Sequence, residues 1–139
     1  MPVAYHLYHQ NPAGQLLEHP DGYAVLRYAA GKRAPTEFQA LVTHLGQLLL
    51  RRGWTCFLSD TRLMEPLSEA EKAWINTYWL DGKMDRPAQL QGAVLLATNA
   101  VTRLGVAQVQ RSAPAANIRY QNFSDEAAAH VYLAGLRRN

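Results

Sequence analysis

Apolar positions along the chain follow two alternating periods, which predict strands and helices in turn. Residues 5–9 and 16–18 are short extended segments separated by the turn formers Asn11, Pro12, Ala13 and Gly14, so an amino-terminal hairpin is expected. Residues 23–28 form a run rich in β-formers. This run predicts a strand that is covered on at least one face.

The clearest helix signal covers residues 36–52. Thr36 and Gln39 have the spacing of a capping box, and Gly53 suits the left-handed position that ends a helix. Apolar side chains recur there with a period near 3.6, at Phe38, Leu41, Val42, Leu45, Leu48 and Leu49. A strand over residues 54–58 follows and stops at the polar segment 59–62.

The unit of strand and helix repeats to the end of the chain. Ser68 and Glu71 form a second capping box, for a helix over 68–80. The remaining elements are a strand over 92–97, a helix capped by Asn99 and ended by Pro114, a strand over 118–123, and a helix from 125 to about 136 capped by Ser124. Parallel neighbours need helical crossovers, so we predict an α/β fold with a mixed, mostly parallel sheet of about five strands, the first antiparallel, and about four helices.

Composition limits the class of protein. The 139 residues fit a single domain over 1–139, and 48% hydrophobic against 18% charged residues exclude charge-driven disorder. The single cysteine, Cys56, has no partner for an intramolecular disulfide, and the amino terminus lacks a basic stretch followed by a long apolar run. The longest aliphatic stretch, 93–97, is far short of the roughly 20 residues that span a bilayer. We therefore expect a cytoplasmic protein with no membrane span.

Charge gives no sign of nucleic-acid binding. The net charge is +3, but Arg51, Arg52, Arg137 and Arg138 lie at predicted helix carboxyl ends, where cations oppose the helix dipole. Without these four, ten basic residues face eleven acidic ones. No basic stripe with interleaved aromatic residues remains.

Motifs for cofactors and metals are also missing from the sequence. None of the nine glycines lies within two residues of another, which excludes the dinucleotide fingerprint and the Walker-type phosphate loop. The five histidines lack the spacing of a metal site, at His6, His9, His19, His44 and His130. We expect neither a cofactor nor a metal.

Ligands of open α/β sheets usually bind beyond the carboxyl ends of the parallel strands. The candidate ligand-binding residues there are Asp60, Arg62, Asn99 and Arg103. The alternative is that they are ordinary caps and turn residues, because every helix needs caps. Cys56, Ser59 and Asp60 are candidates for a chemical role, but Cys56 lies inside a predicted strand, where cysteine is usually inert packing.

Aromatic residues mark a candidate partner surface on the 68–80 helix. Trp74 and Tyr78 are one turn apart, as are Ile75 and Trp79, so aromatic side chains cover a broad arc. One pair is enough to cover the sheet. The other pair would face a pocket or a partner, unless both pairs pack beneath the neighbouring loops.

Several segments together resemble the small SpoIIAA-like bacterial domains of the STAS/SEC14-like group. They are the strand ending at 59–62, the capped helix with Trp74, the Ala-Val-Leu-Leu strand, and the carboxyl-terminal segment 123–133, in which Tyr132 stands where the family often has tryptophan. The resemblance implies a non-enzymatic role. It also makes Ser68 the comparable phosphorylation position, although Glu69 and Glu71 would repel an added phosphate.

Three functions follow in order of preference. The first is a regulatory protein-interaction module that is not an enzyme and binds a protein partner or a second copy of itself, through Trp74, Tyr78 and Trp79. The second is a binder of a small apolar ligand or lipid at the strand carboxyl ends. The third is a hydrolase-type enzyme.

Overall fold

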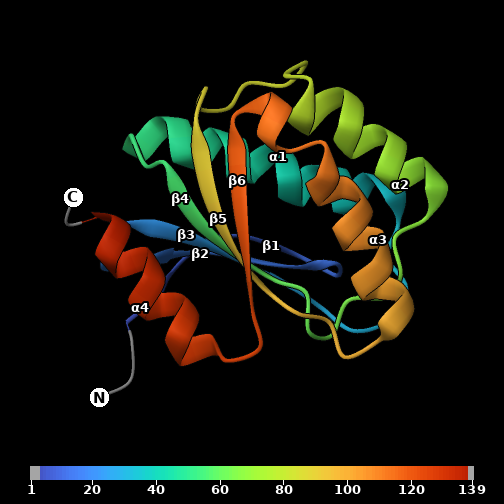
Figure 1. Cartoon of the computed structure of the whole chain (residues 1–139), viewed down its shortest axis with the longest axis horizontal. Helices are drawn as coiled ribbons and strands as arrows, with labels where there is room; N and C mark the ends of the chain where they lie inside the picture. Colours follow the sequence, from blue (N-terminus) through green and yellow to red (C-terminus); the bar gives the residue numbers. More distant parts are fainter. Residues whose placement is uncertain (1–3, 138–139) are drawn as a thin grey trace.

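The computed structural model describes residues 4–137 and shows one six-stranded sheet between two layers of helices (Figure 1). The strands are β1 (His6–Asn11), β2 (Gly14–His19), β3 (Tyr23–Tyr28), β4 (Cys56–Asp60), β5 (Leu90–Leu95) and β6 (Ile118–Phe123). The helices are α1 (Pro35–Arg52), α2 (Glu69–Trp74), the π-helix η1 (Ile75–Leu80), α3 (Ala100–Arg111), the short 3-10 helix η2 (Pro114–Ala116) and α4 (Glu126–Arg137).

The strands lie in the sheet in the order in which they occur in the chain. The β1–β2 and β2–β3 pairings are antiparallel, and β3 to β6 pair in parallel. The predicted α/β class with a mixed, mostly parallel sheet is therefore confirmed. The hairpin contributes two full strands, which makes six strands where about five were expected.

The strand order explains how the helices divide between the two faces. Each parallel connection, through α1, α2 with η1, and α3, moves one strand further in the same direction. Crossovers of one hand then place all three connecting helices on the same face. Helix α4 follows the last strand, leads to no further strand, and packs on the opposite face against β4, β5 and β6 (Figure 1).

Each face has its own apolar core. The face under α1 buries the larger one, around Leu26, Phe38, Phe57 and Trp79. The face under α4 buries a smaller cluster of Tyr23, Val25, Cys56, Leu58, Ala93, Leu95, Ala129 and Leu133. Alternate residues of one strand point to opposite faces, so β3 and β4 contribute to both cores.

Two predicted helix starts are wrong by one or two residues. Helix α1 begins at Pro35, and the Glu37 carboxylate accepts the backbone N–H of Ala34 at 2.8 Å, so Thr36 is not the cap. Helix α4 begins at Glu126, and the Asp125 carboxylate accepts the N–H of Ala128 at 3.2 Å in place of the predicted cap Ser124. One carboxylate lies in the first turn of α1 and the other immediately before α4, and the helix dipole favours negative charge at both places.

Two other predicted caps are confirmed. The Ser68 hydroxyl accepts the N–H of Glu71 at 3.0 Å, and the Glu71 carboxylate accepts the N–H of Ser68 at 2.9 Å. The Asn99 side chain accepts the N–H groups of Val101 and Thr102 at 2.8 and 3.1 Å. Within the described part of the chain, no helix is long and apolar enough to cross a membrane.

The helix predicted over 68–80 is continuous but changes type. Its second half is the π-helix η1, in which the N–H of Asp81 donates to the carbonyl of Asn76, five residues back, at 2.9 Å. The wider turn alters which side chains face the sheet. As a result, Ile75, Trp79 and Leu80 are buried.

Candidate functional site

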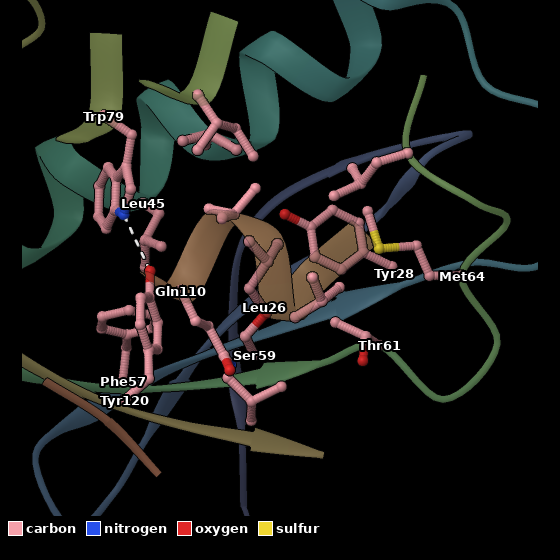
Figure 2. Close-up of a pocket in the computed structure, with 16 residues that line it drawn as sticks. Leu26, Tyr28, Leu45, Phe57, Ser59, Thr61, Met64, Trp79, Gln110 and Tyr120 are labelled. Atoms are coloured by element: carbon pink, nitrogen blue, oxygen red, sulfur yellow. Dashed lines mark hydrogen bonds between the residues drawn. The ribbon is translucent and has the colours of Figure 1, made fainter. Parts of the chain in front are cut away.

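An apolar cavity of about 70 Å³ lies between the sheet and the helical layer formed by α1, η1 and α3 (Figure 2). It is next to the carboxyl-terminal halves of β3 and β4. The lining residues come from strands, helices and the loop after β4: Leu26, Tyr28, Val42, Leu45, Phe57, Ser59, Thr61, Met64, Leu67, Ile75, Trp79, Val94, Val106, Val109, Gln110 and Tyr120. None of them carries a charge, so the cavity suits an uncharged and mainly apolar molecule.

Small side chains on α3 face the cavity side of the molecule. Thr102, Gly105 and Val109 are the buried residues of α3, and the Thr102 hydroxyl donates to the Met64 carbonyl at 3.0 Å. This hydrogen bond ties the helix to the loop after β4. Near the other end of α3, Gln110 and Asn122 exchange side-chain hydrogen bonds of 2.8 and 3.3 Å at the solvent margin.

One wall of the cavity is a fixed aromatic cluster. The Trp79 indole N–H donates to the Tyr120 hydroxyl at 3.1 Å, and both rings meet Phe57 edge to face at 5.8 and 5.9 Å. Burial raises the pKa of Tyr120 to about 12 against the opposing effect of the Trp79 hydrogen bond. Trp79 is only 3% exposed, so its assignment to a partner surface is wrong: the π-helix turns it into the core.

A different hydroxyl in the cavity has no partner. Tyr28 is 8% exposed, and Figure 2 shows its hydroxyl directed toward the middle of the cavity. No residue of the described segment 4–137 forms a hydrogen bond with that hydroxyl. Tyr28 lines the cavity, so a molecule bound there could reach its unpaired hydroxyl.

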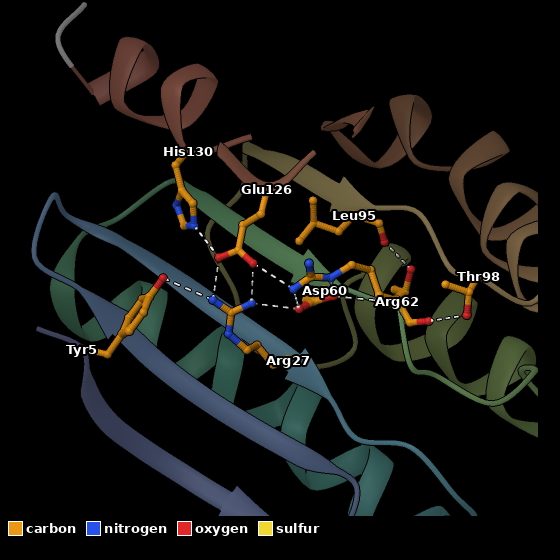
Figure 3. Close-up of polar contacts among 9 residues, drawn as sticks. Tyr5, Arg27, Asp60, Arg62, Leu95, Thr98, Glu126 and His130 are labelled. Carbon is orange, nitrogen blue, oxygen red and sulfur yellow. Dashed lines mark hydrogen bonds and ion pairs between the residues drawn. The ribbon is translucent and has the colours of Figure 1, made fainter. Parts of the chain in front are cut away.

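A polar cluster occupies the other face of the sheet, beneath α4 (Figure 3). Arg62 contacts both carboxylate oxygens of Asp60 at 2.9 and 2.8 Å, and Arg27 contacts Asp60 at 2.8 Å. Both arginines also reach Glu126 on α4, each with an ion pair of 2.8 Å. Arg27 and Asp60 face each other across the parallel β3–β4 pairing, which explains how the arginine and carboxylate meet. We call these four residues the ion-pair cluster.

Aromatic and histidine side chains extend the ion-pair cluster toward β2. Both ring nitrogens of His130 form hydrogen bonds, one with Glu126 at 2.9 Å and the other with the Tyr23 hydroxyl at 2.5 Å. His19 stacks on Tyr23 with ring centroids 4.3 Å apart. Burial lowers the pKa of His19 against the opposing charge of Asp21, which favours a neutral ring.

The electrostatics of the ion-pair cluster keep all four members charged. Hydrogen bonding from Arg27 lowers the pKa of Glu126 to about 2. Burial alone would raise the pKa of Asp60, but the hydrogen bonds from Arg62 and Arg27 lower it overall. Two positive and two negative groups therefore balance each other. The ion-pair cluster has the charged groups needed to hold α4 against the sheet. Its hydrogen-bonding groups are already paired within the protein.

The four predicted ligand-binding residues separate into two pairs. Asp60 and Arg62 come together, but they belong to the ion-pair cluster. Asn99 caps α3, and Arg103 donates to the carbonyls of Ala97 and Thr98 at 2.8 and 3.2 Å. No hydrogen bond within residues 4–137 joins the first pair to the second.

The predicted partner surface keeps two of its aromatic residues. Trp74 and Tyr78 stack with centroids 5.2 Å apart, and Trp74 also meets Phe38 edge to face at 6.1 Å. Tyr78 is exposed, whereas Trp74 is partly buried. Ser68 accepts the Glu71 N–H as a cap, and Glu71 in turn pairs with Arg33 at 2.7 Å.

Most of the residues that line the cavity or form the ion-pair cluster were not candidate site residues in the sequence analysis. Tyr28, Arg27 and Glu126 were not candidates, although Tyr28 and Arg27 end a strand that was predicted correctly. A polar residue in the last positions of a buried parallel strand was the available signal.

Within residues 4–137, no three His, Cys, Asp or Glu side chains gather as a potential metal site. Searches against protein-family models, curated proteins and solved structures found no match to the chain.

Proposed function

We propose that the protein binds a small, uncharged, mainly apolar ligand in the cavity between the sheet and the α1, η1 and α3 layer. The observation that carries the proposal is the cavity itself, an uncharged space beside the carboxyl ends of β3 and β4. Protein interiors are close-packed, so a space of this size beside the main core offers room for a small ligand. The proposal keeps the second function predicted from sequence but moves it to other residues.

The π-helix supports the same assignment. Helices of this type are rare and often occur at functional sites. Here η1 supplies Ile75 and Trp79 to the cavity wall. A role in binding alone agrees with the non-enzymatic role that the SpoIIAA-like resemblance implies. It also agrees with the cytoplasmic location expected from sequence.

The test uses methylenecyclopentane, a compact hydrocarbon, and protein NMR. We expect saturable shifts of amide and methyl signals from residues that line the cavity. Val106→Phe places a ring on the lining and should weaken binding at least tenfold, whereas Val131→Phe, on an exposed site of α4, should leave it unchanged. Equal binding by the two variants, or no saturable shift in the wild type, would contradict the proposal.

A second candidate function is protein contact, and an exposed apolar surface favours it. Leu63, Val101 and Leu104 are all exposed. Thr98 donates to the Arg62 carbonyl through its N–H at 3.2 Å and its hydroxyl at 3.0 Å, which holds the Leu63 loop beside the start of α3. Exposed apolar residues gathered on neighbouring segments are typical of interaction sites.

Sedimentation over a wide range of protein concentration tests this contact with a second copy of the chain. We expect the wild type to self-associate and Leu104→Lys to remain monomeric. Val131→Lys is the control, because Val131 is even more exposed than Leu104 but lies on α4. A monomeric wild type, or association that both variants retain, would exclude this surface.

A further inference from the structure

We infer that the ligand carries one hydrogen-bond acceptor oxygen, and that the Tyr28 hydroxyl is the group that selects it. This inference rests on the proposed function, because it names the chemical class that the cavity prefers. Figure 2 shows the Tyr28 oxygen directed into the space enclosed by β3, η1 and α3. Selection by one hydroxyl would separate small ketones, ethers and alcohols from hydrocarbons of the same shape.

The hydroxyl has no structural role within the protein. The Tyr28 ring packs against Phe38 with centroids 6.0 Å apart, a contact that phenylalanine would make equally well. Burial raises the pKa of Tyr28, so the group is a neutral donor at ordinary pH. An acceptor on a bound ligand would give this cavity-facing donor the hydrogen bond that the described residues do not supply.

The other polar groups of the lining are mostly occupied. The Tyr120 hydroxyl accepts from Trp79, and the Thr61 hydroxyl donates to the Leu95 carbonyl at 2.6 Å. The Gln110 amide pairs with Asn122. Ser59 is half-buried and offers a second hydroxyl, but it lies nearer solvent than Tyr28. Of the two tyrosine hydroxyls in the lining, only that of Tyr28 forms no hydrogen bond with residues 4–137.

The size of the cavity narrows the ligand class. One water-sized sphere occupies roughly 10–15 Å³ on this scale. A space of about 70 Å³ therefore holds about five or six non-hydrogen atoms. Since no lining residue is charged, the acceptor must be a neutral oxygen. The inferred class is a compact ring or branched chain of about six heavy atoms with a carbonyl, ether or hydroxyl oxygen.

Cyclopentanone and methylenecyclopentane test the inference, because they share one shape and differ only in the exocyclic oxygen or methylene. Dissociation constants for both are measured by NMR titration of the wild type, Tyr28→Phe and Tyr78→Phe. We expect Tyr28→Phe to lower the affinity for cyclopentanone relative to that for methylenecyclopentane by about tenfold. Tyr78→Phe removes an exposed hydroxyl outside the cavity and should leave the ratio unchanged.

The possible outcomes separate this inference from the proposed function. If neither compound binds the wild type, the cavity is not a ligand site and the proposed function fails. If both bind and Tyr28→Phe leaves their affinity ratio at the wild-type value, the acceptor inference alone is overturned. Thermal unfolding of Tyr28→Phe without ligand verifies its fold. A Tm close to that of the wild type is expected, because the hydroxyl forms no hydrogen bond within residues 4–137 that the variant would lose.

Discussion

The two faces of the sheet differ in how their polar groups are satisfied. Beneath α4, Arg27, Asp60, Arg62 and Glu126 form ion pairs whose charges balance. Beneath α1, η1 and α3, the core is apolar and contains a cavity, and the cavity-lining hydroxyl of Tyr28 has no partner among residues 4–137. The α4 face has many charged groups, which are paired with one another. The opposite face has few polar groups, and one of them is a hydrogen-bond donor without a partner.

This difference bears on where a ligand could bind. Each member of the ion-pair cluster already contacts two or more groups, so a ligand would have to displace an existing partner. A ligand that enters the cavity would instead satisfy a group that now has no partner. The free energy available for binding is therefore greater on the apolar face.

The largest expected effect comes from breaking the ion-pair cluster. Arg27→Met leaves Asp60 and Glu126 with one arginine between them in a partly buried site, and should lower the free energy of unfolding by about 2–3 kcal/mol. Chemical denaturation measures the change. Arg119→Met is the control, because Arg119 is exposed on β6, and its effect should stay below about 0.5 kcal/mol.

Ligand binding by the same variant tests whether the two faces of the sheet act independently. Folded Arg27→Met should bind methylenecyclopentane with the wild-type affinity, because Arg27 points away from the cavity. If Arg27→Met is as stable as Arg119→Met, the ion-pair cluster does not dock α4. Loss of ligand affinity in the folded variant would mean that the two faces are coupled.

A pair of glycine substitutions tests the packing behind the cavity. A Cβ on Gly92 would lie 2.7 Å from Phe57 Cζ and 2.9 Å from the Tyr120 ring, so Gly92→Ala should destabilise the protein by about 1–3 kcal/mol. A Cβ on Gly105 would lie 3.7 Å from Leu67, an ordinary contact. Gly105→Ala should therefore stabilise α3 by about 0.5 kcal/mol.

Thermal unfolding of the two variants gives the comparison directly. Changes in Tm of opposite sign would support the tight packing of Phe57 and Tyr120 against the backbone of β5. Equal changes in Tm would show that the aromatic wall can move, and that the cavity has no fixed shape.

An acid-dependent loss of stability is also expected on the α4 face. The pKa of Glu126 is lowered from 4.5 to about 2, so the unfolded chain takes up the proton first as pH falls. The stability from this group is fully present above pH 4.5 and is lost as pH falls toward about 2. Because Glu126 is partly exposed, we expect a loss of about 1–2 kcal/mol.

Denaturation curves of the wild type and Glu126→Gln across this pH range measure that loss. The variant should be less stable than the wild type at neutral pH, and the difference should shrink on acidification. A difference that does not change with pH would show that the Glu126 carboxylate does not contribute through its charge.

Local sequence signals predicted much of the fold. The caps at Ser68 and Asn99 and the strand over 23–28 are confirmed, because each depends on residues that are close in the chain. Thr36 and Ser124 were wrong as caps because nearby carboxylates, Glu37 and Asp125, take that role. Competing candidates within a few residues are hard to rank from sequence alone.

The candidate site was much less predictable. Arg27, Asp60 and Glu126 meet across 33 and 99 residues of sequence separation, counted from Arg27. The position of Trp79 depends on the change from α-helix to π-helix, which the hydrophobic pattern did not show. Only the tertiary structure marks Tyr28 as a candidate ligand-binding residue, because the hydroxyl groups around it have other hydrogen-bond partners.

The sequence by itself determined the order of strands and helices, two of the four helix caps and the mostly parallel sheet, because propensities, caps and periodicity act over short distances. Only the tertiary structure decided which face carries which chemistry. The single direction of the strand order places three helices on one side and leaves α4 alone on the other. The ion-pair cluster and the cavity with Tyr28 depend on that division, since side chains distant in the chain meet only after the sheet and helices have packed.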